Sequence, residues 1–187
     1  FATPLAYVLI RRPPMYDGFR HFLFMLPPVF IFIGLGLDWI FEKIRSLNWL
    51  RAGLIIALIA PGLFALVQLH PYQYTYYNSL VGGTGGAFRR FETDYWLTCY
   101  KEAVERIPAS SGRINLFVRR EPYIAGTYAP GFITIRDWRT EQNQIQSGDL
   151  VLVNTRSNED RKTFKDAPVL VEVARAGTTF CYVRQVP

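Results

Sequence analysis

Two long, almost uncharged apolar stretches stand out in the first seventy residues of the chain. Residues 22–40 contain a single charged side chain, Asp38, and residues 53–69 contain none. As a helix, the first stretch would be about 28 Å long at about 1.5 Å per residue, close to the thickness of a bilayer's hydrocarbon core. The connecting segment 41–52 is short, polar and basic. We therefore predict an α-helical transmembrane hairpin over residues 22–69.

Residues 1–21 are expected to hold the end of a preceding membrane helix and an outer loop. The chain starts with Phe1 rather than Met, and residues 5–10 are apolar. Residues 11–18 contain two prolines and a glycine, which end a helix. We expect the chain to be the C-terminal part of a longer membrane protein.

Residues 70–91 are rich in aromatic residues and glycine, and we predict an interfacial linker there. Tyrosine has an apolar ring and a polar tip, which suits the headgroup layer of a bilayer. Four tyrosines fit this description: Tyr72, Tyr74, Tyr76 and Tyr77. The glycine-rich run 82–86 follows a membrane span rather than a strand, so we interpret it as a flexible connector rather than a phosphate-binding loop.

Residues 92–187 have the pattern of a small soluble α/β domain. An apolar stripe at helical spacing over 96–107 predicts an amphipathic helix, with Thr93 or Asp94 as its cap. A short charged helix is expected at 157–164, and a hairpin turn at 175–177. The expected strands are 114–118, 132–135, 150–153, 169–174 and 179–183.

Composition narrows the classes of function. The net charge is +6, but no basic cluster or nucleic-acid-binding motif accompanies it, so we expect membrane lipids rather than nucleic acid as partners. Cys99 and Cys181 are far apart in the sequence, and we expect two separate half-buried thiols rather than a disulfide. The chain shows no metal-ligand spacing and no cofactor motif, so neither a metal nor a cofactor is predicted.

Two polar clusters flank the predicted spans. The first contains Tyr16, Arg20 and His21, and the second contains His70 and Tyr72. Because successive spans reverse direction, the start of one and the end of the next lie at the same membrane face. Arg20 and His21 could bind a phosphate there, or they could anchor the helix at the headgroups; the residues alone favour neither.

A third cluster covers residues 89–96 and mixes arginine, acidic and aromatic residues. Its charges could pair locally at the start of a helix or could bind a ligand. We favour local ion pairs.

The chain resembles the C-terminal part of bacterial integral-membrane glycosyltransferases of the C-type, the superfamily of protein O-mannosyltransferases and lipid A aminoarabinose transferases. The resemblance is carried by three blocks: Tyr-Asp-Gly-Phe-Arg-His-Phe-Leu-Phe at 16–24 with Leu-Pro-Pro at 26–28, His-Pro-Tyr-Gln-Tyr at 70–74 with Asn78 and Val-Gly-Gly at 81–83, and Arg-Phe-Glu-Thr-Asp-Tyr-Trp at 90–96. It extends to about Tyr100 and is weak beyond that residue.

The resemblance implies a polyprenyl-phosphate-sugar donor and transfer to an acceptor at the outer face of the bacterial inner membrane. It also implies that the catalytic acidic residue lies upstream of this chain, so no residue here is assigned as catalytic. The substrate-binding candidates are Tyr16, Arg20, His21, His70 and Tyr72.

The same resemblance implies an orientation that lysine and arginine counts do not decide. Each side of the hairpin carries three basic residues: Arg11, Arg12 and Arg20 on one side, and Lys43, Arg45 and Arg51 on the other. The family places the first three outside and makes the C-terminal domain extracytoplasmic. The alternative function is a non-enzymatic, membrane-anchored α/β binding module.

Overall fold

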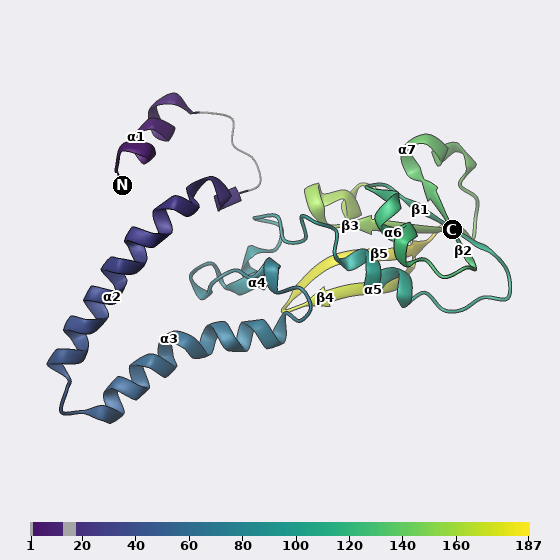
Figure 1. Cartoon of the computed structure of the whole chain (residues 1–187). Coiled ribbons are helices and arrows are strands. Elements are labelled where there is room, and N and C mark those ends of the chain that lie inside the picture. The colour runs from purple at the N-terminus through teal and green to yellow at the C-terminus, as the bar shows by residue number, and fades with distance from the viewer. Residues whose placement is uncertain (1, 13–17) are drawn as a thin grey trace. The chain divides into compact units, whose positions relative to one another are not determined.

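The computed structural model describes the backbone of residues 2–12 and 18–187 and the side chains of residues 3–12 and 22–187. The chain divides into two compact units between Ala60 and Pro61 (Figure 1). Two long apolar helices lie in the N-terminal part of the chain, and a small mixed α/β sheet follows them in the sequence. This order of elements confirms the coarse fold prediction.

The N-terminal unit is helical. Helix α1 (Ala2–Arg11) comes first, followed by the 3-10 helix η1 (Gly18–Met25) and helix α2 (Leu26–Lys43). Two prolines occupy the first turn of α2, where their missing N–H groups cost nothing. Helix α3 (Asn48–Gln68) begins in this unit and ends in the next.

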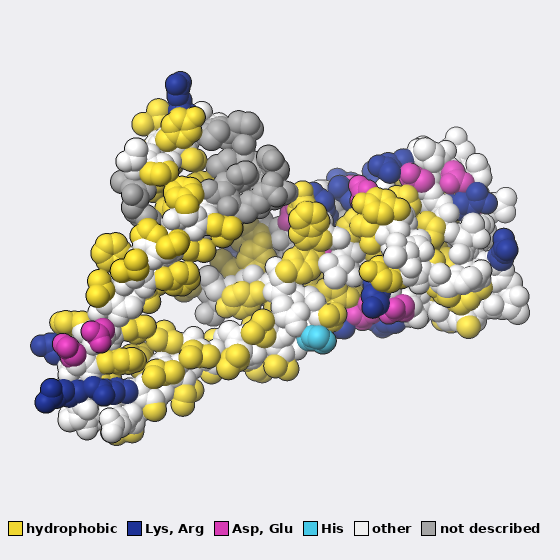
Figure 2. All heavy atoms as spheres, in the orientation of Figure 1, with side chains coloured by type: hydrophobic (Ala, Val, Ile, Leu, Met, Phe, Trp, Pro, Cys, Tyr) yellow, Lys and Arg dark blue, Asp and Glu magenta, His cyan; other side chains and the backbone are white. Residues whose placement is uncertain are grey.

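Helices η1–α2 and α3 are long and apolar enough to cross a membrane. The two segments, Phe22–Lys43 and Asn48–Gln68, have mean hydropathies of 1.9 and 2.2, and neither α2 nor α3 contains a buried residue. In Figure 2, hydrophobic side chains cover both helices, and charged side chains gather at the turn between them. There the Arg51 guanidinium donates to the Phe41 carbonyl at 2.7 Å, close to the C-terminal end of α2.

The C-terminal unit contains a five-stranded mixed sheet in the order β2-β1-β3-β5-β4. Strand β1 is parallel to both β2 and β3, whereas β5 is antiparallel to both β3 and β4. The strands are β1 (Ile114–Val118), β2 (Ile133–Asp137), β3 (Leu150–Asn154), β4 (Val169–Arg175) and β5 (Thr178–Gln185). All five predicted strands are therefore present, with ends shifted by at most two residues.

Both faces of the sheet are packed. Helix α5 (Cys99–Glu105) covers β4 and β5, and helix α6 (Pro122–Tyr128) covers β1 and β2, over one continuous apolar core. The other face carries a smaller core around Phe117 and Val153, beside helix α7 (Trp138–Glu141). Alternate residues of β1 thus point to different cores, as the pleat requires.

A disulfide joins Cys99 on α5 to Cys181 on β5 across 82 residues of sequence. Both cysteines are fully buried in the main core. The expectation of two separate thiols is wrong, because the packing of α5 on β5 brings the two side chains together, and sequence spacing gives no hint of this.

The segment after α3 is folded against the C-terminal unit. It forms three short helices, η2 (Gln73–Thr75), η3 (Ser79–Val81) and α4 (Gly83–Ala87). The Thr178 hydroxyl donates to the Thr84 carbonyl at 2.8 Å, and a Cβ on Gly86 would collide with the Val81 carbonyl. The glycines therefore permit close packing, and the prediction of a flexible connector at 82–86 is wrong.

Two helices differ from their predictions. The helix expected over 96–107 is confined to α5, because Leu97 has a left-handed backbone (φ 58°) and Trp96 lies outside the helix. The segment 157–164 is not a regular helix, since Ser157 and Asn158 both have positive φ within the 3-10 stretch η5 (Arg156–Arg161). Neither residue is a helix cap.

Candidate functional site

The five candidate residues predicted from the sequence are described to different degrees. Tyr16 lies outside the described residues. Arg20 and His21 belong to η1, but their side chains are outside the described set. His70 and Tyr72 are described in full and belong to the C-terminal unit.

His70 is exposed at the end of α3. Its Nδ1 lies 2.9 Å from the side-chain nitrogen of Gln73, and its carbonyl accepts a hydrogen bond from Arg175 Nε at 3.2 Å. The backbone of His70 is thus tied to the β4–β5 hairpin, while its ring faces solvent. This arrangement leaves the ring accessible to a ligand.

Tyr72 is a core residue, only 1% exposed. Its ring packs against Phe180 at 4.8 Å between centroids, and its hydroxyl donates to Glu102 at 2.9 Å. Arg175 completes a triad, since its guanidinium donates to the same Glu102 oxygen at 2.8 Å. Tyr72 therefore does not expose its ring to a headgroup layer, contrary to the sequence interpretation.

The charged form of Glu102 is held by these two partners. Burial opposes ionisation of the carboxyl, but the hydrogen bonds from Tyr72 and Arg175 outweigh it and lower the pKa of Glu102. Burial, together with the bond to Glu102, raises the pKa of the Tyr72 hydroxyl, so the tyrosine remains the proton donor. The triad connects the segment after α3 to α5 and to β4.

Tyr74 and Asp94 organise the start of α5. The Tyr74 hydroxyl donates to the Asp94 carboxylate, which also accepts from the backbone N–H groups of Thr98 and Cys99 at 3.0 and 3.1 Å. The Asp94 side chain thus binds N–H groups at the start of α5, but the N-cap position belongs to Thr98 rather than to Thr93 or Asp94 as predicted. Burial raises the pKa of Asp94 despite these bonds.

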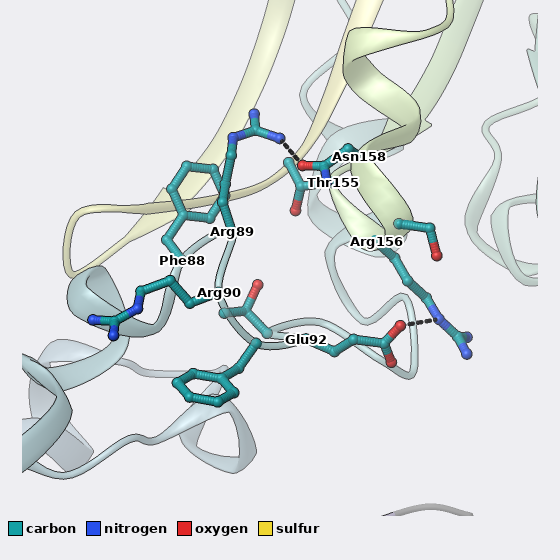
Figure 3. A pocket seen from close by; sticks show the side chains of 10 residues that line it. Phe88, Arg89, Arg90, Glu92, Thr155, Arg156 and Asn158 are labelled. Carbon is teal, nitrogen blue, oxygen red and sulfur yellow. Dashed lines mark hydrogen bonds and ion pairs between the residues drawn. The ribbon is translucent and has the colours of Figure 1, made fainter.

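A hollow of about 180 Å³ lies between segments 88–93 and 155–158 (Figure 3). Arg89 and Arg156 line it but are paired: Arg89 donates to Asn158 at 2.8 Å, and Arg156 Nε donates to Glu92 at 3.2 Å. The Arg90 side chain is exposed and makes no hydrogen bond or ion pair within the described part of the chain. The prediction of local ion pairs within residues 89–96 is wrong, because Arg89 and Glu92 pair with residues 156–160, far away in the sequence.

Buried carboxylates beside this hollow account for further arginines. Asp160 is 3% exposed and forms a two-point ion pair with Arg89 at 2.6 and 3.1 Å. Glu159 is bridged by Arg119 and Arg120 at 2.8 and 3.3 Å. Arg119 and Arg120 follow β1, at the carboxyl edge of the parallel strands where open α/β sheets commonly bind ligands. In this protein the chain's own η5 segment binds there instead.

A second, larger hollow of about 490 Å³ lies between residues 71–72, 96–98 and the helices α5 and α6. Trp96, Lys101, Glu105 and Tyr128 contribute side chains to it. The helical spacing of 96–107 predicted a buried helix face for Trp96, and no sequence pattern pointed to the other three residues. No sequence signal could have gathered residues from three separate segments into one hollow.

No group of three or more metal-ligating side chains occurs among the described residues. The chain matches no family model, no curated protein and no solved structure. The fold therefore defines only a class of architecture, in which two apolar helices, each able to span a membrane, are joined to a small mixed α/β unit.

Proposed function

We propose that this chain is the C-terminal part of a membrane glycosyltransferase that transfers a sugar from a polyprenyl-phosphate carrier to an acceptor. The observation that carries the proposal is the set of three sequence blocks at 16–28, 70–83 and 90–96, which resemble C-type glycosyltransferases. The catalytic acidic residue of such an enzyme would lie in a segment upstream of this chain. The present residues then supply the last two spans, the residues that contact the lipid-linked donor at the outer membrane face, and an appended domain.

The bare apolar surface of α2 and α3 supports a location in the membrane. An apolar helix without a buried residue would be costly in water, because each exposed large side chain forfeits about 1.5–3 kcal/mol of burial energy. Hydrocarbon, or the other helices of a larger bundle, removes this cost. Membrane lipids are thus proposed as partners of this surface.

The disulfide supports an extracytoplasmic position for the C-terminal unit. Disulfides persist in oxidising compartments and are rare in the cytosol. The Cys99–Cys181 bond therefore favours the outer face of a bacterial inner membrane. In that orientation, the turn between α2 and α3, with Lys43, Arg45 and Arg51, faces the cytoplasm, where basic residues are favoured.

The donor phosphate is proposed to contact Arg20 and His21, with Tyr16 and His70 at the same membrane face. A polyprenyl tail must stay in hydrocarbon while its phosphate cannot, so the phosphate lies at the headgroup level. A guanidinium at that depth offers a forked set of donors to phosphate oxygens. Tyr72 acts in this proposal as a positioning residue, because its hydroxyl already donates to Glu102 and its ring is buried.

We predict that Arg20→Ala weakens use of the lipid-linked donor by roughly ten- to a hundredfold. This range corresponds to loss of one charge-assisted hydrogen bond, about 1.5–3 kcal/mol. Arg20→Lys keeps the charge but not the fork, so its loss should be smaller. The measurement is the transfer rate against the concentration of polyprenyl-phosphate sugar, using the complete reading frame at matched membrane levels.

Arg90→Ala is the control, since the Arg90 side chain is exposed and makes no hydrogen bond or ion pair among the described residues. It should leave donor dependence unchanged. If Arg20→Ala kept the wild-type rate and donor dependence, Arg20 would be an interfacial anchor. If the complete protein transferred no sugar from any polyprenyl-phosphate donor, the membrane-anchored binding module would replace the enzyme.

A further inference from the structure

The hollow over α5 and α6 has two exposed aromatic walls. Trp96 is 63% exposed and Tyr128 is 42% exposed, and both line the same space. Exposed aromatic side chains that share one hollow are typical of binding sites, whereas single exposed ones need no explanation. One wall comes from the segment before α5 and the other from the end of α6.

Neighbouring contacts hold both rings in place. Trp96 makes an edge-on contact with Tyr95 at 5.0 Å between ring centroids, and the Arg156 guanidinium lies 3.9 Å from the Tyr95 centroid. The Lys101 ammonium lies 5.5 Å from the centroid of the Tyr128 ring. Rings fixed in this way lose little conformational entropy on binding a ligand.

Polar groups line the same hollow as the two rings. Glu102 is held in its ionised form by Tyr72 and Arg175, as described above. Glu105 is exposed, and its carboxylate has no hydrogen bond or ion pair among the residues that the structure describes. Glu105 and the Lys101 ammonium are thus an acceptor and a donor available to a ligand beside two apolar ring faces.

We propose that this hollow binds a saccharide. A pyranose presents a C–H face that can pack on an aromatic ring and a rim of hydroxyl groups that can donate to carboxylates. The volume of about 490 Å³ lies within the range of small-molecule sites. A phosphate-rich ligand fits poorly, because two carboxylates line the space and would repel it. An entirely apolar ligand would leave those carboxylates desolvated.

This inference goes beyond the proposed function and does not depend on it. If both hold, the hollow would take the sugar of the acceptor rather than the lipid-linked donor, since it lies in the sheet unit and not on the apolar helices. A binding-only protein could use the same hollow. The two proposals therefore have separate tests. Absence of sugar binding would overturn the saccharide site, and absence of sugar transfer would overturn the proposed enzyme.

The test is binding of defined trisaccharides to the full chain in lipid nanodiscs. The probes are trisaccharides of glucose, mannose, galactose and N-acetylglucosamine, followed by saturation-transfer NMR and by titration. We expect at least one to bind saturably at millimolar or lower concentration. Trp96→Ala and Tyr128→Ala should each weaken binding about tenfold or more, and Glu105→Gln by a smaller factor.

Tyr123→Ala is the control, because Tyr123 is a 69% exposed tyrosine on the same helix α6 that does not line the hollow. Its binding should match the wild type. The proposal is overturned if no probe saturates the wild-type protein, if the Trp96 and Tyr128 variants bind as tightly as wild type, or if Tyr123→Ala loses as much. Since Glu105→Gln is an isosteric surface change, it remains informative if an aromatic variant does not fold.

Discussion

Replacing Cys99 and Cys181 together by alanine is expected to destabilise the C-terminal unit by about 4 kcal/mol, from the chain entropy released when a loop of this length is opened. The bond closes a loop across 82 residues, which includes β1, β2, β3 and the helix α6. Both side chains are fully buried, so the replacement also removes packing from the main core. Few single features of the unit constrain so much of its chain.

Hydrogen exchange of the sheet amides, measured in detergent-solubilised protein, reports this loss of stability for the C-terminal unit alone. A reducing agent should lower the protection of the wild-type amides in the same way. The double variant is the control for the reducing agent, because its protection should not change. Wild-type protein that contained two free thiols, or a double variant with wild-type protection, would contradict the disulfide.

Gly86→Ala is expected to destabilise the same unit by at least about 2 kcal/mol, because it overpacks a tight backbone contact. A Cβ at this position would lie well inside van der Waals contact with the Val81 carbonyl, and backbone atoms cannot rotate away as a side chain can. The displaced turn would also pull α4 from the β4–β5 hairpin, where Gly85 packs closely against Ala176.

Gly112→Ala is the matched control, since a Cβ there would meet nothing within 4 Å. It should change stability by less than about 0.5 kcal/mol. The comparison is made by denaturant unfolding of the two variants, with the sheet unit followed by near-ultraviolet circular dichroism. Equal stability of the two variants would show that segment 82–87 is a loose connector after all.

The five strands and the two long apolar helices were predictable from the pattern of apolar and polar residues. Every strand combines β-branched or aromatic residues with turn residues at its ends, and the Arg175–Gly177 hairpin has positive φ at Ala176 and Gly177 as such a turn requires. Helix α6 was missed because it has only seven residues and includes Gly126, which weakens a helical pattern. The irregular η5 was misassigned because its shape depends on ion pairs from distant arginines rather than on local propensity.

The candidate site was less predictable than the fold. Sequence alone suggested that the charges around Arg89 pair with one another, but the structure pairs Arg89 with Asp160, which is 71 residues away. Tyr72 follows a predicted membrane span and has the apolar ring and polar tip of an interfacial residue. Only the tertiary structure shows that its ring packs on Phe180 and that its hydroxyl binds Glu102. Trp96 illustrates the opposite case, since its spacing predicts burial but a left-handed residue at Leu97 turns it outward.

The sidedness of the C-terminal unit tests the central claim most directly, because the proposed contact with the lipid-linked donor requires the outer face and the disulfide favours it. Both cysteines of residues 1–187 are in the disulfide, so a single cysteine introduced elsewhere in this segment adds one free thiol to it. Ser111→Cys places one in an exposed turn of the sheet unit, and Ser46→Cys places one in the turn between α2 and α3. The measurement is labelling of each variant in intact cells by a membrane-impermeant maleimide. We predict that Ser111→Cys is labelled in intact cells and that Ser46→Cys is labelled only after the membrane is opened; labelling of Ser46→Cys from outside, with Ser111→Cys protected, would contradict the account.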